Sequence, residues 1–366
     1  MTRKIYASLL ALIIALTAIG LTGQQSERTV TAAPAAAGHD LLSQLPASDF
    51  ILYADAQRML TEIVPNILSD RTEARARFEA DMDRFQKETG FDPRTLEVVA
   101  VGLNFNDSQR ARDYDFTFVA RGRFDAQATI EAGLNSATKQ SEGRLEKKSQ
   151  QYEGRTIYLV GNAERKVVVG SGPQTGESGV QIMTPKQVPG DDAPRPATTH
   201  DRSMAFVALD SNTIAFGNMK SVRATIDASM GRERVSDELV QLATRTPNAV
   251  AGFSGTITPE MARSLRIGPN KAQESIASIR QIYGSFNING NEAEAFVNLR
   301  AETPEQARQL GTMIKLAAAL GRQHASNRGG SLEALIKDLS IEAVGNEVQV
   351  SLKFAQADLA PFIQRL

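Results

Sequence analysis

One short pattern recurs along this chain and restricts its fold: a β-rich run, a residue that caps a helix, and an amphipathic helix. Asp, Asn and Thr occupy the cap position, where their side-chain oxygens accept hydrogen bonds from free N–H groups of the first helical turn. Thr303 and Gln306 have the spacing of a capping box, and Pro259 and Pro304 stand where a helix needs no N–H. The strands are Phe50–Ala54, Phe116–Phe124, Thr213–Gly217, Ala249–Ile257, Ala293–Glu302 and Val348–Ala355, and their caps are Asp55, Asp125, Asn218, Thr258, Thr303 and Asp358.

Short turns join several other β-rich runs. Asp210-Ser211-Asn212, Asn289-Gly290-Asn291 and Gly345-Asn346 each lie between two such runs. Strands joined by tight turns pair antiparallel, because a parallel pair needs a long crossover. The pattern therefore predicts an α+β fold of antiparallel sheets with helices packed on one face. Pro65 is expected to kink or end the helix that starts near Asp55.

The two halves of the chain show the same order of strands and helices. This repetition predicts two related α+β units, 41–169 and 203–366. Between them, residues 170–202 hold five of the 14 prolines and several glycines, so we expect a linker or loop there. The residues that correspond between the halves are Arg121, Gln127 and Ala128 with Arg300, Gln306 and Ala307.

The N-terminal segment 1–26 indicates export. Arg3 and Lys4 precede an uncharged run, rich in Leu, Ile and Ala, that extends from Ile5 to Ser26. The length of this run lies between the core of a cleaved signal peptide and a membrane-spanning helix, so both interpretations stay open. The basic residues place the rest of the chain outside the cytoplasm, in the periplasm or the extracellular space. We expect residues 27–40 to be a flexible tract that joins this segment to the folded part.

Composition excludes several classes of function. The chain has 41 basic and 42 acidic residues, a net charge of −1, and no block of either sign, which argues against a nucleic-acid partner. It has no cysteine, which excludes thiol catalysis, thiolate metal sites and a lipid-modified cysteine anchor. Hydrophobic residues make up 42% of the chain, enough to stabilise a core without disulfides.

The residue types that usually carry catalysis are scattered along this sequence. His39, His200 and His324 fall in expected loops, and Ser254 lacks the spacing of a nucleophile elbow. Glu292 and Glu294 share one face of a strand, but they adjoin a turn where exposed charge is common. We therefore expect no catalytic residue, no cofactor and no metal site. Asp81 and Asp83 lie in an expected helix dense with Arg and Glu, so we expect them on a solvated face, and Asp113 and Asp115 form a further carboxylate pair.

The most apolar helix is expected at Ala307–Gly321. Such a helix packs on its own sheet, lines a lipid pocket or contacts a partner. The expected contact residues for a protein partner or an apolar ligand are Leu310, Met313, Ile314 and Leu316.

Several short motifs resemble those of a broad group of exported bacterial proteins of unknown function. The segment Leu45-Pro46-Ala47-Ser48-Asp49 before an apolar strand is similar to the start of their mature part, although Ser48-Asp49 replaces an acidic residue and Thr. The resemblance extends over about residues 45–230 and implies a location and a fold, with no catalytic residues to transfer. The other similar motifs are Phe118–Asp125, Tyr152–Arg155 and Phe216–Asn218.

These observations leave three hypotheses for function. The first is a non-enzymatic exported or membrane-anchored protein that binds a partner or ligand in the cell envelope. The second is a carrier of a hydrophobic ligand such as a lipid, with Ala307–Gly321 lining its cavity. The third is a hydrolase in which Ser254, Glu292 or Glu294 converge in a pocket.

Overall fold

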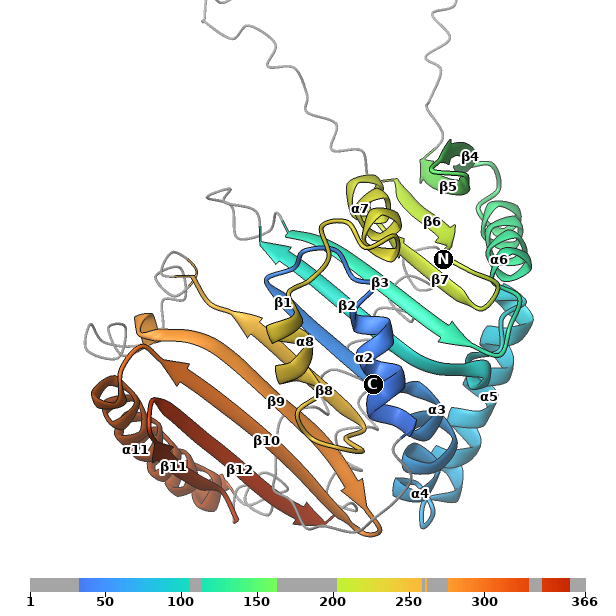
Figure 1. The fold of residues 1–366 in the computed structure, drawn as a ribbon. Coiled ribbons are helices and arrows are strands. Elements are labelled where there is room, and N and C mark those ends of the chain that lie inside the picture. The colour runs from blue at the N-terminus through green and yellow to red at the C-terminus, as the bar shows by residue number, and fades with distance from the viewer. Residues whose placement is uncertain are drawn as a thin grey trace, which may run out of the picture.

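A computed structural model describes residues 33–105, 114–162, 203–258, 261, 276–328 and 338–355. Its main element is an antiparallel sheet of 12 strands (Figure 1). In chain order the strands are β1 (Phe50–Asp55), β2 (Leu96–Phe105), β3 (Tyr114–Gly122), β4 (Leu145–Tyr152), β5 (Arg155–Asn162), β6 (Met204–Ala208), β7 (Thr213–Gly217), β8 (Ala251–Thr256), β9 (Ile279–Asn289), β10 (Glu292–Ala301), β11 (Ser340–Val344) and β12 (Glu347–Ala355).

The strand order across the sheet is β11-β12-β10-β9-β8-β1-β2-β3-β7-β6-β5-β4. β1 lies inside the sheet and pairs with β2 on one side and β8 on the other. Its four central residues, Ile51 to Ala54, are all buried, because side chains on both faces of the sheet here are covered. The sequence of such a strand is a continuous apolar run and does not alternate between apolar and polar residues.

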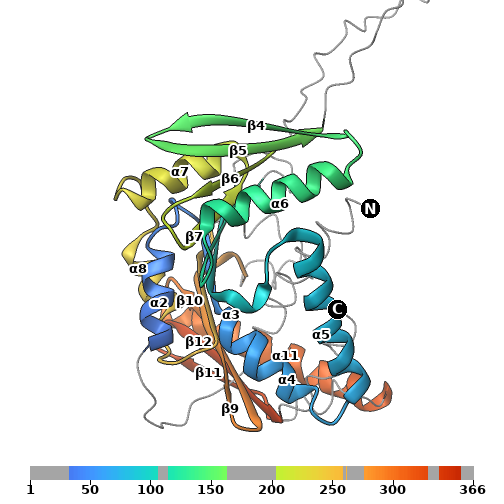
Figure 2. The ribbon, with the colours of Figure 1, turned by 90° about the vertical axis from the view of Figure 1, so that its right-hand side faces the viewer.

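Helices cover both faces of the sheet (Figure 2). The face that we call the α2 face carries α2 (Ala33–Leu42), α7 (Met219–Ser229) and α8 (Asp237–Ala243). The opposite face, the α11 face, carries the remaining described helices. These are α3 (Ala56–Arg58), the π-helical turn η1 (Met59–Ile63), α4 (Val64–Ile67), α5 (Thr72–Thr89), the 3₁₀ turn η2 (Pro93–Thr95), α6 (Ala126–Gln140) and α11 (Pro304–Arg328).

The predicted helix starts are confirmed by their hydrogen bonds. Asp55 Oδ1 accepts from the Arg58 N–H at 2.9 Å, and Asp125 Oδ1 accepts from the Ala128 N–H at 2.8 Å. The capping box is reciprocal: Thr303 Oγ1 accepts from Gln306 N–H at 3.2 Å, and Gln306 Oε1 accepts from Thr303 N–H at 3.1 Å. Asp358 lies outside the described residues.

The sequence predicted that Pro65 would kink or end its helix, and the structure shows that the helix does not end there. Pro65 lies within the first turn of α4, directly after η1. Val64 N–H donates to the Met59 carbonyl, five residues back, so the π-helical turn shifts the hydrogen-bond pattern just before a residue that lacks an N–H.

The α+β class and the antiparallel pairing are confirmed, but the expected arrangement of units is corrected in three ways. The two expected sheets are one continuous sheet, and helices lie on both of its faces. The boundary at residue 203 is wrong, because β7 pairs with β3 and β6 pairs with β5. β6, β7 and α7 therefore belong to the first half of the sheet. The expected linker or loop, residues 170–202, lies outside the described residues, and the strands before and after it, β5 and β6, are neighbours in the sheet.

The tract 27–40 was expected to be flexible, and this is wrong for residues 33–40, which form most of α2. Leu41 and Leu42 at the end of this helix are fully buried against the α2 face. Gly38 lies so close to Tyr53 that an added Cβ would be 2.7 Å from the ring. The helix is therefore part of the core, and the segment 1–26 and residues 27–32 lie outside the described residues.

The two halves have the same strand topology. The first orders its strands β1-β2-β3-β7-β6, and the second orders them β8-β9-β10-β12-β11, with α6 and α11 in corresponding connections. Cross-strand partners correspond as well: Arg121 Nε donates to Thr213 Oγ1 at 3.2 Å, and Arg300 Nε donates to Glu347 Oε1 at 3.0 Å. The hairpin of β4 and β5 is an addition at the edge of the first half. This correspondence supports the predicted duplication, which stays a prediction.

Replacement of Tyr53 by Phe should raise stability. Tyr53 is fully buried beneath α2, and its hydroxyl has no hydrogen-bond partner in the part of the chain that the structure describes. An unsatisfied buried hydroxyl costs about 1–3 kcal/mol. Tyr53→Phe should therefore raise the free energy of unfolding by about 1 kcal/mol in urea titrations, whereas Tyr53→Ala should lower it by about 3–5 kcal/mol. A loss above about 1 kcal/mol in Tyr53→Phe would mean that the hydroxyl has a partner.

Candidate functional site

The α2 face of the second half is polar and carries no described helix in front of β10 and β12 (Figure 1). Side chains alternate between the faces of a strand, and the apolar set of these strands packs toward the α11 face. We call the opposite set the polar face. It comprises Gln281, Tyr283 and Ser285 of β9, Phe296, Asn298 and Arg300 of β10, and Glu347, Gln349 and Ser351 of β12.

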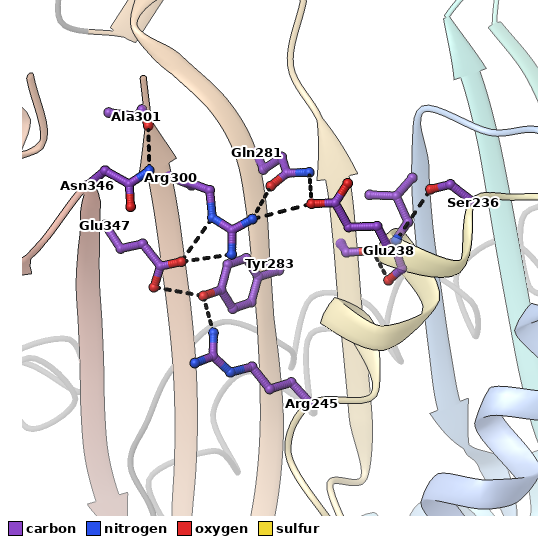
Figure 3. Close-up of polar contacts among 11 residues, drawn as sticks. Ser236, Glu238, Arg245, Gln281, Tyr283, Arg300, Ala301, Asn346 and Glu347 are labelled. Carbon is purple, nitrogen blue, oxygen red and sulfur yellow. Dashed lines mark hydrogen bonds and ion pairs between the residues drawn. The ribbon is translucent and has the colours of Figure 1, made fainter. Parts of the chain in front are cut away.

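Arg300 is the centre of a hydrogen-bond cluster on this face (Figure 3). Its guanidinium donates from Nε to Glu347 Oε1 at 3.0 Å, and Nη2 forms an ion pair with the same oxygen at 2.9 Å. Its Nη1 donates to Gln281 Oε1 at 2.6 Å and lies 3.4 Å from Glu238 Oε1 on α8. The planar guanidinium holds its donors in a fixed fork that reaches acceptors on three elements, whereas a lysine ammonium is a single point charge with rotatable donors.

Tyr283 completes the cluster. Its hydroxyl donates to Glu347 Oε2 at 2.9 Å and accepts from Arg245, which follows α8. The guanidinium carbons of Arg245 and Arg300 lie 5.4 Å and 5.6 Å from the centre of its ring, within the range of cation–π attraction. Only 1% of Tyr283 is exposed.

Electrostatics stabilise the cluster in its charged, hydrogen-bonded state. Burial raises the pKa of Tyr283, and its hydrogen bond to Glu347 raises it further, so the hydroxyl stays a neutral donor. Burial is the largest single influence on the pKa of Arg300 and lowers it, but the hydrogen bond and charge attraction of Glu347, together with Tyr283, outweigh burial, so the pKa of Arg300 is raised. The charges are thus paired with each other, and the cluster attaches α8 to β9, β10 and β12 rather than presenting an acid and a base to a substrate.

Asn298 lies beside this cluster but, unlike the cluster residues, has a side chain without hydrogen bonds among the described residues. Asn298 is directly opposite Tyr283 on β9 and Gln349 on β12, and it is fully buried. Neither Nδ2 nor Oδ1 has a hydrogen-bond partner in the described part of the chain. Buried amide groups are nearly always paired with protein or water, so this one needs an explanation.

The residues of the hydrolase hypothesis do not come together. Ser254 is fully buried on β8 beneath α8, and its hydroxyl donates to the Leu239 carbonyl at 2.7 Å. Glu294 pairs with Lys353 across the strands at 3.1 Å, and Glu292 is exposed at the start of β10. Ser254 on β8 and Glu294 on β10 therefore lie on different strands and have separate partners, Leu239 on α8 and Lys353 on β12.

The other titratable candidates are also separated. His39 is exposed on α2, the side chain of His324 on α11 is outside the described set, and His200 and Asp113 are not described. Asp81 pairs with Arg84 at 2.5 Å, Asp83 with Arg94 at 2.6 Å, and Asp115 with Lys220 at 2.7 Å. Among the described residues no three His, Asp or Glu side chains are grouped as metal ligands, and no helix is long and apolar enough to span a membrane.

The four predicted contact residues on α11 divide into two groups. Leu310 is fully buried, and Met313 and Ile314 pack against the same cluster with Ile341 and Val348. Leu316, in contrast, is 62% exposed, and Leu320 one turn later is 55% exposed. The sheet thus uses one side of this apolar helix and leaves another side open.

A small polar cavity lies at the other end of the α2 face, near α7. Its volume is ≈ 60 Å³, space for one or two waters. It is lined by Pro46, Ala47, Ser48, Gly102, Asn104, Asp115, Thr117, Lys220, Ser221 and Ala224.

No family model matches this chain, and no curated protein matches it either. Among solved structures, the chain is similar to crystal form III of TP0453, with a TM-score of 0.43 and 12% identity over 89% of this chain and 98% of that one. Crystal form IV of TP0453 gives 0.42 and 12% over 91% and 100%. These values identify neither a family nor a function. The resemblance of the Leu45–Asp49 segment to exported bacterial proteins therefore stays a prediction.

Removal of the Tyr283 hydroxyl should destabilise the protein, in contrast to Tyr53→Phe. Tyr283→Phe leaves Glu347 Oε2 and Arg245 each without one hydrogen bond in a partly buried cluster. We expect the free energy of unfolding to fall by about 1–3 kcal/mol in urea titrations. An unchanged value would show that the cluster does not hold α8 on the sheet.

The pH dependence of stability should contain a contribution from Glu294. Burial raises the pKa of this carboxyl, and the hydrogen bond from Lys353 offsets only part of the effect. Since the folded state holds the proton more tightly than the unfolded state, the free energy of unfolding falls as pH rises from about 4.3 through the folded pKa. Urea titrations between pH 4 and 8 should show a smaller fall in Glu294→Gln than in the wild type. Glu342→Gln, at an exposed position on β11, is the control, and an equal fall in both variants would contradict the assignment.

Proposed function

We propose that this chain is a non-enzymatic exported or membrane-anchored protein that acts in the cell envelope by binding a partner. The observation that carries the proposal is the open side of α11, where Leu316 and Leu320 are 62% and 55% exposed. Leu316 and Leu320 are one helical turn apart and lie on the same side of the helix, and exposed apolar residues that are grouped in this way mark interaction sites. The N-terminal segment 1–26 supports the location.

The arrangement of polar residues supports a role without catalysis. The Arg300 cluster uses its charges internally, and Ser254 and Glu294 each have a structural partner. A catalytic site needs a nucleophile or base within hydrogen-bond reach of its activating group. A single alanine substitution that abolished a measured turnover of the purified protein would contradict this part of the proposal.

An open helix surface favours a partner over a lipid enclosed in a cavity. A cavity for a drug-sized or larger ligand has a volume of about 300–1,000 Å³. The cavity near α7, formed by described residues, has a volume of ≈ 60 Å³, which is too small for an acyl chain. Lipid carriage is therefore the second hypothesis, and co-purified lipid that is lost in Leu316→Lys would favour it.

A photocrosslinking residue at position 316 should identify the partner. The full chain would carry the residue in the cells that make it, and Arg77, exposed on α5, is the matched control position. We expect one discrete crosslinked product from position 316 and none from position 77, and Leu320→Lys should reduce the yield at least fivefold. Equal labelling from both positions would contradict a specific surface on α11.

A further inference from the structure

Four side chains of the polar face form a compact patch, Phe296, Asn298, Gln349 and Ser351. Phe296 is directly opposite Ser351, and Asn298 is directly opposite Gln349, on the neighbouring strands β10 and β12. All four point to the α2 face because residues two apart on a strand share a face. We call them the Phe296 patch.

The polar groups of this patch lack partners. Both amide atoms of Asn298 are buried and unpaired, and the side chains of Gln349 and Ser351 make no hydrogen bond within the part of the chain that the structure describes. A buried polar group without a partner lowers the stability of the fold. Groups from outside the protein chain are the natural partners for this amide.

The groups around the patch are already paired. Glu294 binds Lys353 at one end, and Arg300 binds Glu347 at the other, at 3.1 Å and 2.9 Å. On β9, Ser285 Oγ donates to Thr246 Oγ1 at 2.7 Å. The patch therefore lies between two neutralised ion pairs, and a charged ligand would gain no unpaired counter-charge there.

We propose that the Phe296 patch binds a neutral saccharide. A sugar ring has an apolar C–H side that packs on an aromatic ring, and its neighbouring hydroxyls both donate and accept hydrogen bonds. One amide group with a free donor and a free acceptor, as in Asn298, matches such a pair of hydroxyls. Phe296 is partly exposed beside it and supplies the aromatic surface.

Access to Asn298 requires a movement of its neighbour. Gln349, opposite Asn298, is partly exposed and makes no side-chain hydrogen bond among the described residues, so its rotation breaks no bond. Exposed side chains change rotamer in picoseconds to nanoseconds. In the bound state both amides would then contact the sugar hydroxyls.

Calorimetric titration of the purified full chain tests this proposal. The probes are two neutral tetrasaccharides, of β-1,4-linked N-acetylglucosamine and β-1,4-linked glucose, and the anionic control is polygalacturonate. We expect binding of at least one neutral probe and at least a tenfold weaker binding in Phe296→Ala and in Asn298→Ala. Phe296→Tyr should retain binding, and Glu342→Gln, at an exposed position on β11, should leave it unchanged.

The variants also separate a binding role from a structural one. Because the Asn298 amide makes no hydrogen bond, Asn298→Ala should not lower the urea midpoint, so lost binding would not reflect unfolding. Absence of binding to both neutral probes at millimolar concentration would overturn the proposal, as would binding to polygalacturonate alone. An ordered water at Asn298 with no saccharide binding would do the same. The proposal goes beyond partner binding at α11, and each test can fail without the other.

Discussion

The pairing of β1 with β8 is the constraint on which the rest of this structure depends. It joins strands about 200 residues apart and makes one sheet from two halves with the same topology. The junction is close-packed: a Cβ at Gly252 would lie 2.0 Å from the Ala243 carbonyl and 2.6 Å from the Tyr53 ring. Arg58, just after β1, adds hydrogen bonds to the carbonyls of Asn248 and Ile288 at 3.0 Å and 2.6 Å.

This junction also explains why the two faces of the second half differ. α2 and α8 pack over the centre of the sheet on the α2 face, and this packing buries Tyr53 and the leucines of α2. On the same face β10 and β12 carry polar residues, while their apolar residues pack toward α11 and the helices after β1. The Arg300 cluster attaches the end of α8 where helical cover stops, and the Phe296 patch lies beyond it.

Local features were predictable where neighbouring residues determine them. The caps at Asp55, Asp125 and Thr303 depend on side chains that bond N–H groups two or three residues away, so their sequence signal is strong. The Arg300 cluster was missed because its members come from α8, β9, β10 and β12, up to about 100 residues apart. Only two signals hinted at it: Arg300 corresponds to Arg121, and Glu347 follows the turn at Gly345-Asn346.

The sequence by itself determined the α+β class, the antiparallel hairpins, the helix starts and the absence of thiol chemistry, because these follow from local hydrogen bonding, periodicity and composition. Only the tertiary structure decided that α2 belongs to the core, that β6 and β7 complete the first half, and that β1 joins β8. It also decided which leucines of α11 stay exposed. The physical reason is that strand pairing and burial depend on contacts between segments that are distant in the sequence. A residue's type and its sequence neighbours do not specify which distant residue it contacts.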